Sequence, residues 1–281
     1  ILLGNVAGGL LVAIPDIGHA SVALACVAVA VFGRWMSGRM PALTATHPDE
    51  PINWNPITET MRNLRLARAN AKVFQTLLGI SWMWFFGAVF LSQFPGFAKE
   101  VLHGNEQVAS LLLVVFSIGI AIGSLLCEVL SRRHVEIGLV PLGAIGMTVF
   151  SIDLYGASHA LPPASAALSL AQFTAQAAHW RVLADLALLA LSAGVYSVPM
   201  YALIQIESKA HEVARIIAAN NIINAIFMIA SSLIAGAMLS AGMSIPDIFL
   251  WTGVANAAVT LAIFLAEPSY LHRLAAWLRG A

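Results

Sequence analysis

The sequence predicts an all-α, polytopic membrane protein. Of its 281 residues, 59% are hydrophobic and only 10% are charged, whereas soluble domains contain about 45–50% apolar and about 25% charged residues. The mean hydropathy is +0.84, and apolar segments long enough to cross a bilayer, about 20 residues each, follow one another along the chain. The formal net charge is zero, so the charge balance gives no indication of a nucleic-acid partner.

Seven whole apolar segments are predicted to span the membrane, and a partial segment, 1–14, precedes them. The whole segments are residues 17–36, 73–94, 108–130, 135–157, 181–206, 213–240 and 245–266. Because the chain starts with Ile inside an apolar run and lacks the basic start of a signal peptide, we expect it to be a fragment that begins within a helix. Cys26 and Cys127 each lie in a predicted span and are expected to be packing residues rather than a disulfide or metal pair.

Lysine and arginine predict the orientation of the spans. Taken alternately, the loops on one side hold twelve basic residues, and the loops on the other side hold two, Lys99 and Arg181. Basic residues concentrate in cytoplasmic loops. We therefore expect the long loop after the first whole span, and the C-terminus, to be cytoplasmic.

That long basic loop divides the predicted architecture. Its stretch MPALTATHPDEPINWNP lacks periodicity and is typical of a linker. Two crossings precede it and six follow, the count expected for helices 5–12 of a twelve-helix transporter built from two six-helix halves. In this interpretation 1–38 end a truncated N-terminal half, 39–71 form a cytoplasmic linker with an amphipathic helix, 72–267 form the C-terminal half, and 268–281 form an amphipathic cytoplasmic tail.

The amphipathic helix is predicted to begin near residue 56. Asn55 and Pro56 suit an N-cap and a first helical position, and Ile57, Met61 and Leu64 follow at helical spacing with arginines between them. This pattern is typical of a basic helix lying on the inner leaflet. A solvated connector is the alternative.

Two adjacent spans, 185–206 and 213–240, carry the most unusual residues. The first is expected to be broken at Gly194 and Pro199, which are candidate hinges. A Gly/Pro-interrupted helix beside a polar one is a common way to build a translocation pathway.

The second of these spans contains three asparagines. Asn220 and Asn224 are four residues apart and share one helix face, and polar side chains at membrane depth usually face a bundle interior or a wet cavity. Ser232, Gly236 and Ser240 form a row of small residues suited to helix contact, which would leave the asparagine face free to line a cavity. Hydrogen bonding between packed helices is the alternative role for the asparagines.

Other candidate substrate-binding residues lie on neighbouring spans. Ser81, Trp82 and Phe86 belong to a mixed polar and aromatic stripe near mid-membrane, which suits a cavity that meets both a polar group and an apolar chain. Gln205 is expected to join Asn220 and Asn224 in contacting the polar group. Ordinary packing is the alternative for the stripe.

A small-residue helix ends in a charged turn. Gly119 and Gly123 form a GxxxG pattern, which lets two helix backbones approach closely, and Glu128, Arg132 and Arg133 follow. The turn resembles a degenerate form of the gating motif of the major facilitator superfamily. Two arginines that obey the positive-inside bias are an equally good explanation.

Two acids near predicted span ends, Asp153 and Asp185, could be proton or ion sites, although their positions favour an interfacial role. No Gly-x-x-x-x-Gly-Lys, Cys-x-x-Cys or His-x-x-x-x-Asp pattern occurs. We expect no cofactor, no metal site and no enzymatic activity in this segment.

The stretches LLGISWMWFFGAVFLSQFPGFAKEVL, GSLLCEVLSRRHVEIGLVPLGAIGMTVFSIDL and GVYSVPMYALIQ, the last followed by NNIINA, resemble the bacterial lysophospholipid transporter family of the major facilitator superfamily. The similarity is greatest to the transporter portion of proteins that fuse this carrier to a lysophospholipid acyltransferase and an acyl-carrier-protein ligase, and it covers most of residues 1–267.

The resemblance implies a partial major facilitator fold in the bacterial inner membrane. It implies a carrier that moves lysophospholipids, chiefly lysophosphatidylethanolamine, to the cytoplasmic leaflet for re-acylation. Its partners would be the lysophospholipid substrate, membrane lipid and a fused or associated acyltransferase. The alternatives are the membrane portion of a multidomain phospholipid acyltransferase and a generic drug or solute exporter.

Overall fold

The computed structural model describes residues 14–41, 53–131, 134–161 and 167–279, with a few isolated positions before residue 14. Every regular element in these ranges is helical; Gly104 and Leu168 form an isolated β-bridge. Seven of the helices are long and apolar enough to cross a membrane. The prediction of an all-α, polytopic membrane protein is therefore confirmed, while most of the partial segment 1–14 lies outside the described residues.

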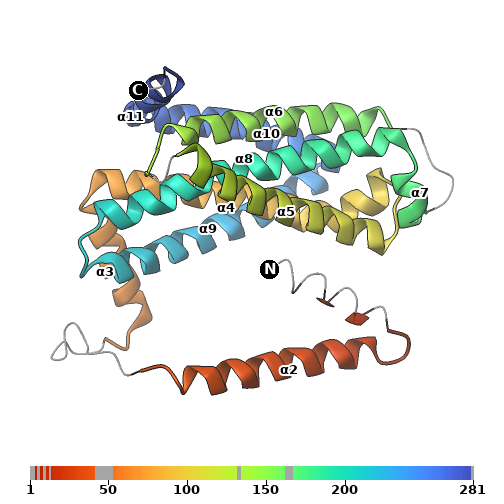
Figure 1. Ribbon diagram of the computed structural model, residues 1–281, viewed down its shortest axis with the longest axis horizontal. Coiled ribbons are helices and arrows are strands. Elements are labelled where there is room, and N and C mark those ends of the chain that lie inside the picture. The colour runs from red at the N-terminus through yellow and green to blue at the C-terminus, as the bar shows by residue number, and fades with distance from the viewer. Residues whose placement is uncertain are drawn as a thin grey trace. The chain divides into compact units, whose positions relative to one another are not determined.

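The chain divides into two compact units, Ile1–Trp54 and Asn55–Ala281. The first contains the spanning helix α2 (Gly18–Ser37), and Figure 1 traces the second from α3 to α11. The spanning helices of the second unit are α4 (Ala71–Gly96), α5 (Glu106–Leu130), α6 (Leu139–His159), α8 (Ala177–Glu207), α9 (Val213–Ser240) and α10 (Ile245–Ala266). A π-helical turn, η1 (Phe97–Val101), extends α4, and the shorter helices are α3 (Pro56–Arg68), α7 (Leu170–Thr174) and α11 (Ser269–Leu278).

Two of the helices start several residues from their predicted positions. α8 begins at Ala177 rather than 181, because its first turn carries interfacial side chains that a count of apolar residues leaves out. One of these, Trp180, donates a hydrogen bond from Nε1 to the Thr174 carbonyl (2.8 Å). α6 begins at Leu139 rather than 135, because the Glu136 carboxylate accepts a hydrogen bond from the Gly138 amide (3.0 Å) and holds a turn before the helix.

The centre of the second unit is built on α4 and α8. The most apolar stretches of α8 and α4 are 67% and 61% buried, against 28% in α5 and 22% in α9. α8 packs between α5 and α6, and α4 packs against α9, α8 and α10; Figure 1 shows α5, α8 and α6 running alongside one another. Side chains on α4 and α8 are therefore surrounded by other helices.

The α5–α8 contact depends on glycine, as the GxxxG pattern predicted. A Cβ atom at Gly119 would lie 2.7 Å from the Ala187 carbonyl oxygen, and one at Gly123 would overlap the Leu191 backbone. From the other helix, a Cβ at Gly194 would lie 2.5 Å from the Ile120 carbonyl oxygen. The two backbones can approach this closely only because these positions lack side chains.

α8 is continuous, although a break was predicted at Gly194 and Pro199. Proline removes one backbone hydrogen bond of a helix, but packed neighbours can maintain a transmembrane helix around it. Gly194 serves the contact with α5, which explains a glycine there without a break. A hinge at either residue stays a prediction.

The contact face of α9 is the opposite of the predicted one. Asn220 and Asn224 are buried, whereas Ser232, Gly236 and Ser240 are exposed on the second unit, and a Cβ at Gly236 would have no neighbour within 4 Å. Buried amides need hydrogen-bonding partners, and α4 provides them. That requirement, rather than the packing of small residues, determines which face turns inward.

The helix α3 begins as predicted and docks on the bundle. Asn55 Oδ1 accepts a hydrogen bond from the Ile57 amide (3.0 Å), and Pro56 is the first helical residue. Ala67 is completely buried, and α3 packs against α9 and α4. Binding of its exposed face to the inner leaflet stays a prediction.

The helix α11 also docks on the bundle, next to the turn between α5 and α6. Arg273 makes a bidentate ion pair with Glu136, with nitrogen–oxygen distances of 2.6 and 3.2 Å. Trp277 Nε1 donates a hydrogen bond to the Leu130 carbonyl (3.2 Å), and Tyr270 is 2% exposed. The predicted amphipathic tail thus uses one face to hold the ends of α5 and α6 together.

Candidate functional site

A network of polar side chains joins α4, α8 and α9 inside the bundle. Ser81, Asn220 and Asn224 are 0%, 3% and 7% exposed, and the Ser81 hydroxyl lies 2.7 Å from the Asn224 amide group. Trp84 Nε1 donates a hydrogen bond to the Tyr201 hydroxyl (2.8 Å). The sequence-predicted residues Ser81, Asn220 and Asn224 therefore meet in one place.

The orientation of the Asn224 amide follows from its neighbours, because amide nitrogen and oxygen are assigned from the hydrogen-bond network. In the orientation that satisfies both atoms, its nitrogen donates to Ser81 Oγ (2.7 Å) and to the Asn220 carbonyl (3.2 Å). Its oxygen accepts from Asn220 Nδ2 (3.0 Å) and Trp84 Nε1 (3.2 Å). Asn220 Oδ1 is buried and accepts no hydrogen bond from the described residues, so one strong acceptor in the network is unused.

A second polar contact lies next to this network and was not predicted. Trp82 Nε1 donates a hydrogen bond to Asn256 Oδ1 (2.9 Å), and Asn256 Nδ2 donates to the Ala144 carbonyl and to Thr148 Oγ1, both at 3.0 Å. Asn256 is completely buried and joins α10 to α4 and α6. An amide in the middle of an apolar span, the signal that identified Asn220 and Asn224, could also have identified Asn256.

The two remaining substrate-binding candidates lie outside the network. Phe86 is 1% exposed and stacks on Phe90 with 4.9 Å between ring centroids, one turn beyond Trp82 on α4. Gln205 is exposed near the end of α8, and the structure does not bring it to Asn220 or Asn224.

Of the gating candidates, only Glu128 lies within the described residues. It is exposed in the last turn of α5, whereas Arg132 and Arg133 lie outside the described part of the chain. Two residues after Glu128, the Leu130 carbonyl accepts the hydrogen bond from Trp277 of α11.

The two acids singled out in the sequence lie on neighbouring helices. Asp153 of α6 forms an ion pair with Arg181 of α8, and both side chains are about half exposed. Asp185 is 4% exposed, so the interfacial position predicted for it does not give it direct contact with solvent.

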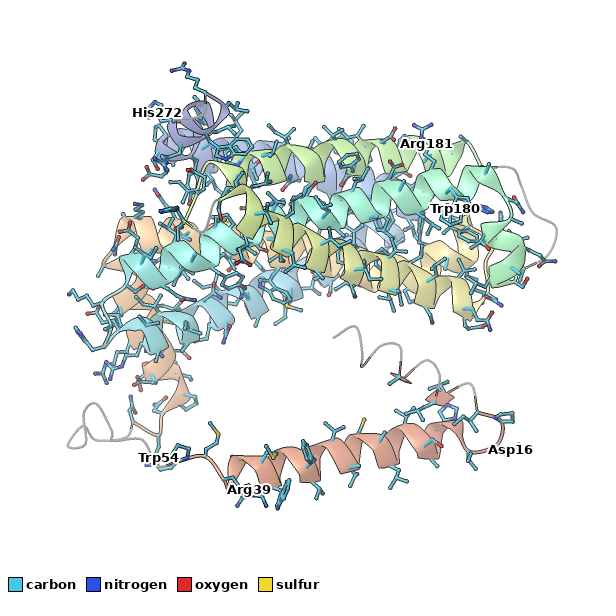
Figure 2. The ribbon with its side chains drawn as sticks, viewed as in Figure 1. Asp16, Arg39, Trp54, Trp180, Arg181 and His272 are labelled. Atoms are coloured by element: carbon cyan, nitrogen blue, oxygen red, sulfur yellow. The ribbon has the colours of Figure 1, made fainter. Side chains whose placement is uncertain are left out.

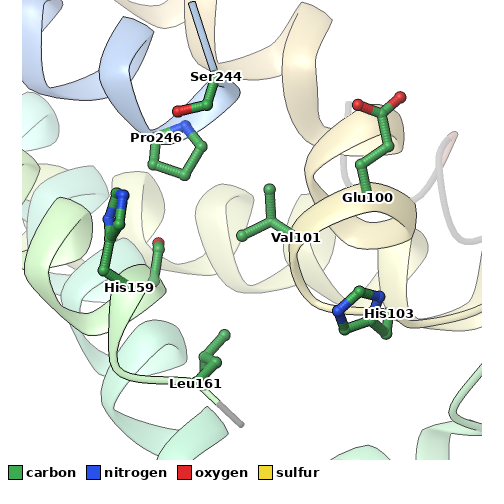
Figure 3. A pocket seen from close by; sticks show the side chains of 8 residues that line it. Glu100, Val101, His103, His159, Leu161, Ser244 and Pro246 are labelled. Atoms are coloured by element: carbon green, nitrogen blue, oxygen red, sulfur yellow. The ribbon is translucent and has the colours of Figure 1, made fainter. Parts of the chain in front are cut away.

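A pocket of about 310 Å³ lies where η1 and α6 end and α10 begins (Figure 3). Its lining comprises Glu100, Val101, His103, Ser158, His159, Leu161, Ser244 and Pro246. None of the predicted substrate-binding residues contributes to it. Within the described ranges, no three His, Cys, Asp or Glu side chains are grouped so that they could hold a metal ion.

Comparison of this chain with protein-family models, with curated proteins and with solved structures found no match.

Proposed function

We propose that the protein is a carrier that moves lysophospholipids, chiefly lysophosphatidylethanolamine, to the cytoplasmic leaflet of the bacterial inner membrane by alternating access. The observation that carries the proposal is the buried network of Ser81, Asn220 and Asn224 between two apolar spans. Polar groups at membrane depth are costly and tend to mark substrate pathways.

The depth of the network supports this role. Ser81 lies ten residues after the start of α4 and Asn224 eleven residues after the start of α9. At about 1.5 Å per residue, these positions are about 15 and 17 Å along their helices. The midplane of a hydrocarbon core about 30 Å thick is therefore close to both, as expected for the substrate site of an alternating-access carrier.

The chemistry of the network suits a zwitterionic head group. Asparagine offers both donors and acceptors, so uncharged amides can meet an ammonium and a phosphate without an unpaired protein charge. Asn220 Oδ1, which accepts no hydrogen bond from the described residues, would accept from an ammonium. The substrate class itself is supported by the resemblance of the sequence to lysophospholipid transporters.

Access to the network requires movement. The three side chains are enclosed where α4 packs on α9, so a head group could reach them only if these helices part. Separation of α4 and α9 is therefore the gating step that we propose.

The decisive experiment replaces Asn224 with leucine in the full protein. We expect Asn224→Leu to insert and fold but to lose uptake of lysophosphatidylethanolamine into spheroplasts, with uptake normalised to folded protein in the membrane. Ser231→Ala is the matched control, because Ser231 is buried on the same helix and, within the described ranges, its hydroxyl bonds to the Met228 carbonyl alone (2.7 Å). Normal uptake per folded molecule by both Asn220→Leu and Asn224→Leu would leave helix packing as the role of the network.

A crosslink tests the gating step separately. Val89 of α4 and Ala235 of α9 lie in one buried apolar cluster, outside the polar network. A pair of cysteines at these two positions should crosslink on oxidation and stop uptake, and reduction should restore it. Uptake that continues when the crosslink is complete would exclude separation of α4 and α9.

A further inference from the structure

Asp153, Arg181 and Asp185 form a charged cluster between α6 and α8. Arg181 Nη2 donates a hydrogen bond to Asp153 Oδ1, with side-chain exposures of 56% and 43%. Asp185, one turn beyond Arg181 on α8, is 4% exposed. Figure 2 shows Arg181 at the surface of the bundle, so the cluster extends from solvent to a buried carboxyl group.

The buried carboxyl group of Asp185 favours a bound proton. An ionised carboxylate only accepts hydrogen bonds, so it gains nothing from a neighbouring carboxylate, whereas a protonated one can donate. One Asp185 oxygen, Oδ2, is buried with no hydrogen-bond partner among the described residues, and a buried charge without a partner is strongly disfavoured.

The surrounding charges do not remove this preference. Asp153 and Arg181 are the other charged groups of this cluster, and with both acids ionised the cluster has a net charge of −1. His179, on the same helix, is turned toward α7, where its ring stacks on Phe173 with a centroid distance of 4.1 Å. One added proton makes the cluster neutral.

We propose that Asp185 is a proton-binding site, that Asp153 loads it from the aqueous phase, and that its occupancy controls lipid movement. Control of lipid movement rests on the proposed carrier function, whereas proton binding by Asp185 and loading by Asp153 do not. In loading, hydronium gives its proton to Asp153 and leaves as water, and the proton then passes to an oxygen of Asp185. One O–H bond forms for each one broken, and release reverses the steps.

The link to lipid movement runs through α8. Loss of the proton leaves two carboxylates and only one arginine at the α6–α8 contact, so the excess negative charge is unfavourable there. The same helix carries Tyr201, which accepts the hydrogen bond from Trp84 in the polar network. A change in how α8 sits against α6 can therefore reach the substrate site.

Infrared spectroscopy of the protein in lipid vesicles tests proton binding directly. A protonated carboxyl group gives a carbonyl band that disappears on ionisation, so we expect a band that titrates with pH and is missing in Asp185→Asn. Asp247→Asn is the matched control: Asp247 accepts hydrogen bonds from the backbone and hydroxyl of Ser244 as a carboxylate, and its loss should leave the band unchanged.

A second variant covers the case in which Asp185→Asn does not fold. Asp153→Asn changes a half-exposed residue, removes the repelling charge and frees Arg181 for Asp185, so the midpoint of the band should fall by about one pH unit or more. A titrating band that persists in Asp185→Asn, or a midpoint unmoved in Asp153→Asn, would overturn the site.

Measurements of transport distinguish failure of the proton site from failure of the proposed carrier function. If the carrier function holds, uptake of lysophosphatidylethanolamine should depend on pH in the wild type and lose that dependence in Asp185→Asn. Uptake with the same pH dependence in both would overturn proton control. If the wild type moves no lysolipid while the band still depends on Asp185, the proton site stands and the proposed carrier function falls.

Discussion

At the scale of single residues, Asn256 of α10 links three helices. Its side chain accepts a hydrogen bond from Trp82 of α4 and donates two to α6. A buried donor that loses its acceptor still carries the free-energy cost of its removal from water. Asn256 is the acceptor for the Trp82 indole N–H, so loss of the Asn256 side chain would leave that N–H unpaired.

We therefore predict that Asn256→Leu lowers the free energy of unfolding by about 1–3 kcal/mol. Reversible unfolding in mixed micelles measures this loss. Thr260→Val, one turn further along α10, should cost much less, because the Thr260 hydroxyl bonds back to its own helix at the Asn256 carbonyl (2.6 Å). In a Trp82→Phe background the cost of Asn256→Leu should shrink; an unchanged cost would mean that the indole bond is unimportant.

At the scale of helices, the α5–α8 contact is set by backbone distance. Gly123 faces the Leu191 backbone with no room for a methyl group, whereas Gly236 on α9 has open space around it. The same substitution should therefore have opposite effects at the two positions.

Gly123→Ala should lower the free energy of unfolding by about 1–3 kcal/mol, the usual cost of overpacking. Gly236→Ala should leave it unchanged or raise it by up to about 1 kcal/mol through helix propensity. Both are measured by unfolding in micelles. Equal effects at the two glycines would contradict the close approach of α5 and α8.

The docking of α11 depends on a different interaction, the ion pair of Arg273 with Glu136. The arginine is half exposed, but its partner Glu136 is only 10% exposed, so Arg273→Ala should cost about 1–3 kcal/mol of global stability by leaving that carboxylate unpaired. Amide hydrogen exchange in α11 should accelerate before exchange elsewhere in the bundle. Arg279→Ala, an exposed arginine in the same segment, is the control and should leave exchange in α11 unchanged.

At the scale of the whole molecule, the basic residues predict one orientation in the membrane. A cysteine at Ser37 or Ser131 should react with an impermeant reagent only from the cytoplasm, and one at Gln107 only from outside. Gln107 is preferable to Asn105, whose side chain caps α5 by accepting from the amides of residues 107 and 108. Reversed labelling at two of these positions would refute the orientation.

The sequence alone determined the class of the protein and most helix limits. Long apolar segments can satisfy their backbone polar groups in lipid only as helices, so composition and length are sufficient. The spans 213–240 and 245–266 have their predicted ends, and Asn55 with Pro56 correctly marked the start of α3. These are local properties, decided within one or two turns of the chain.

Only the tertiary structure decided which faces of the helices pack against one another. Asn220 and Asn224 turn toward α4, while the small residues from Ser232 to Ser240 do not form the contact on the second unit. All faces of these spans are similarly apolar, so periodicity gives little indication of direction. The choice depends on whether a partner on another helix can satisfy a buried amide, and Ser81, 143 residues away in sequence, is brought to Asn224 only by the packing of α4 on α9.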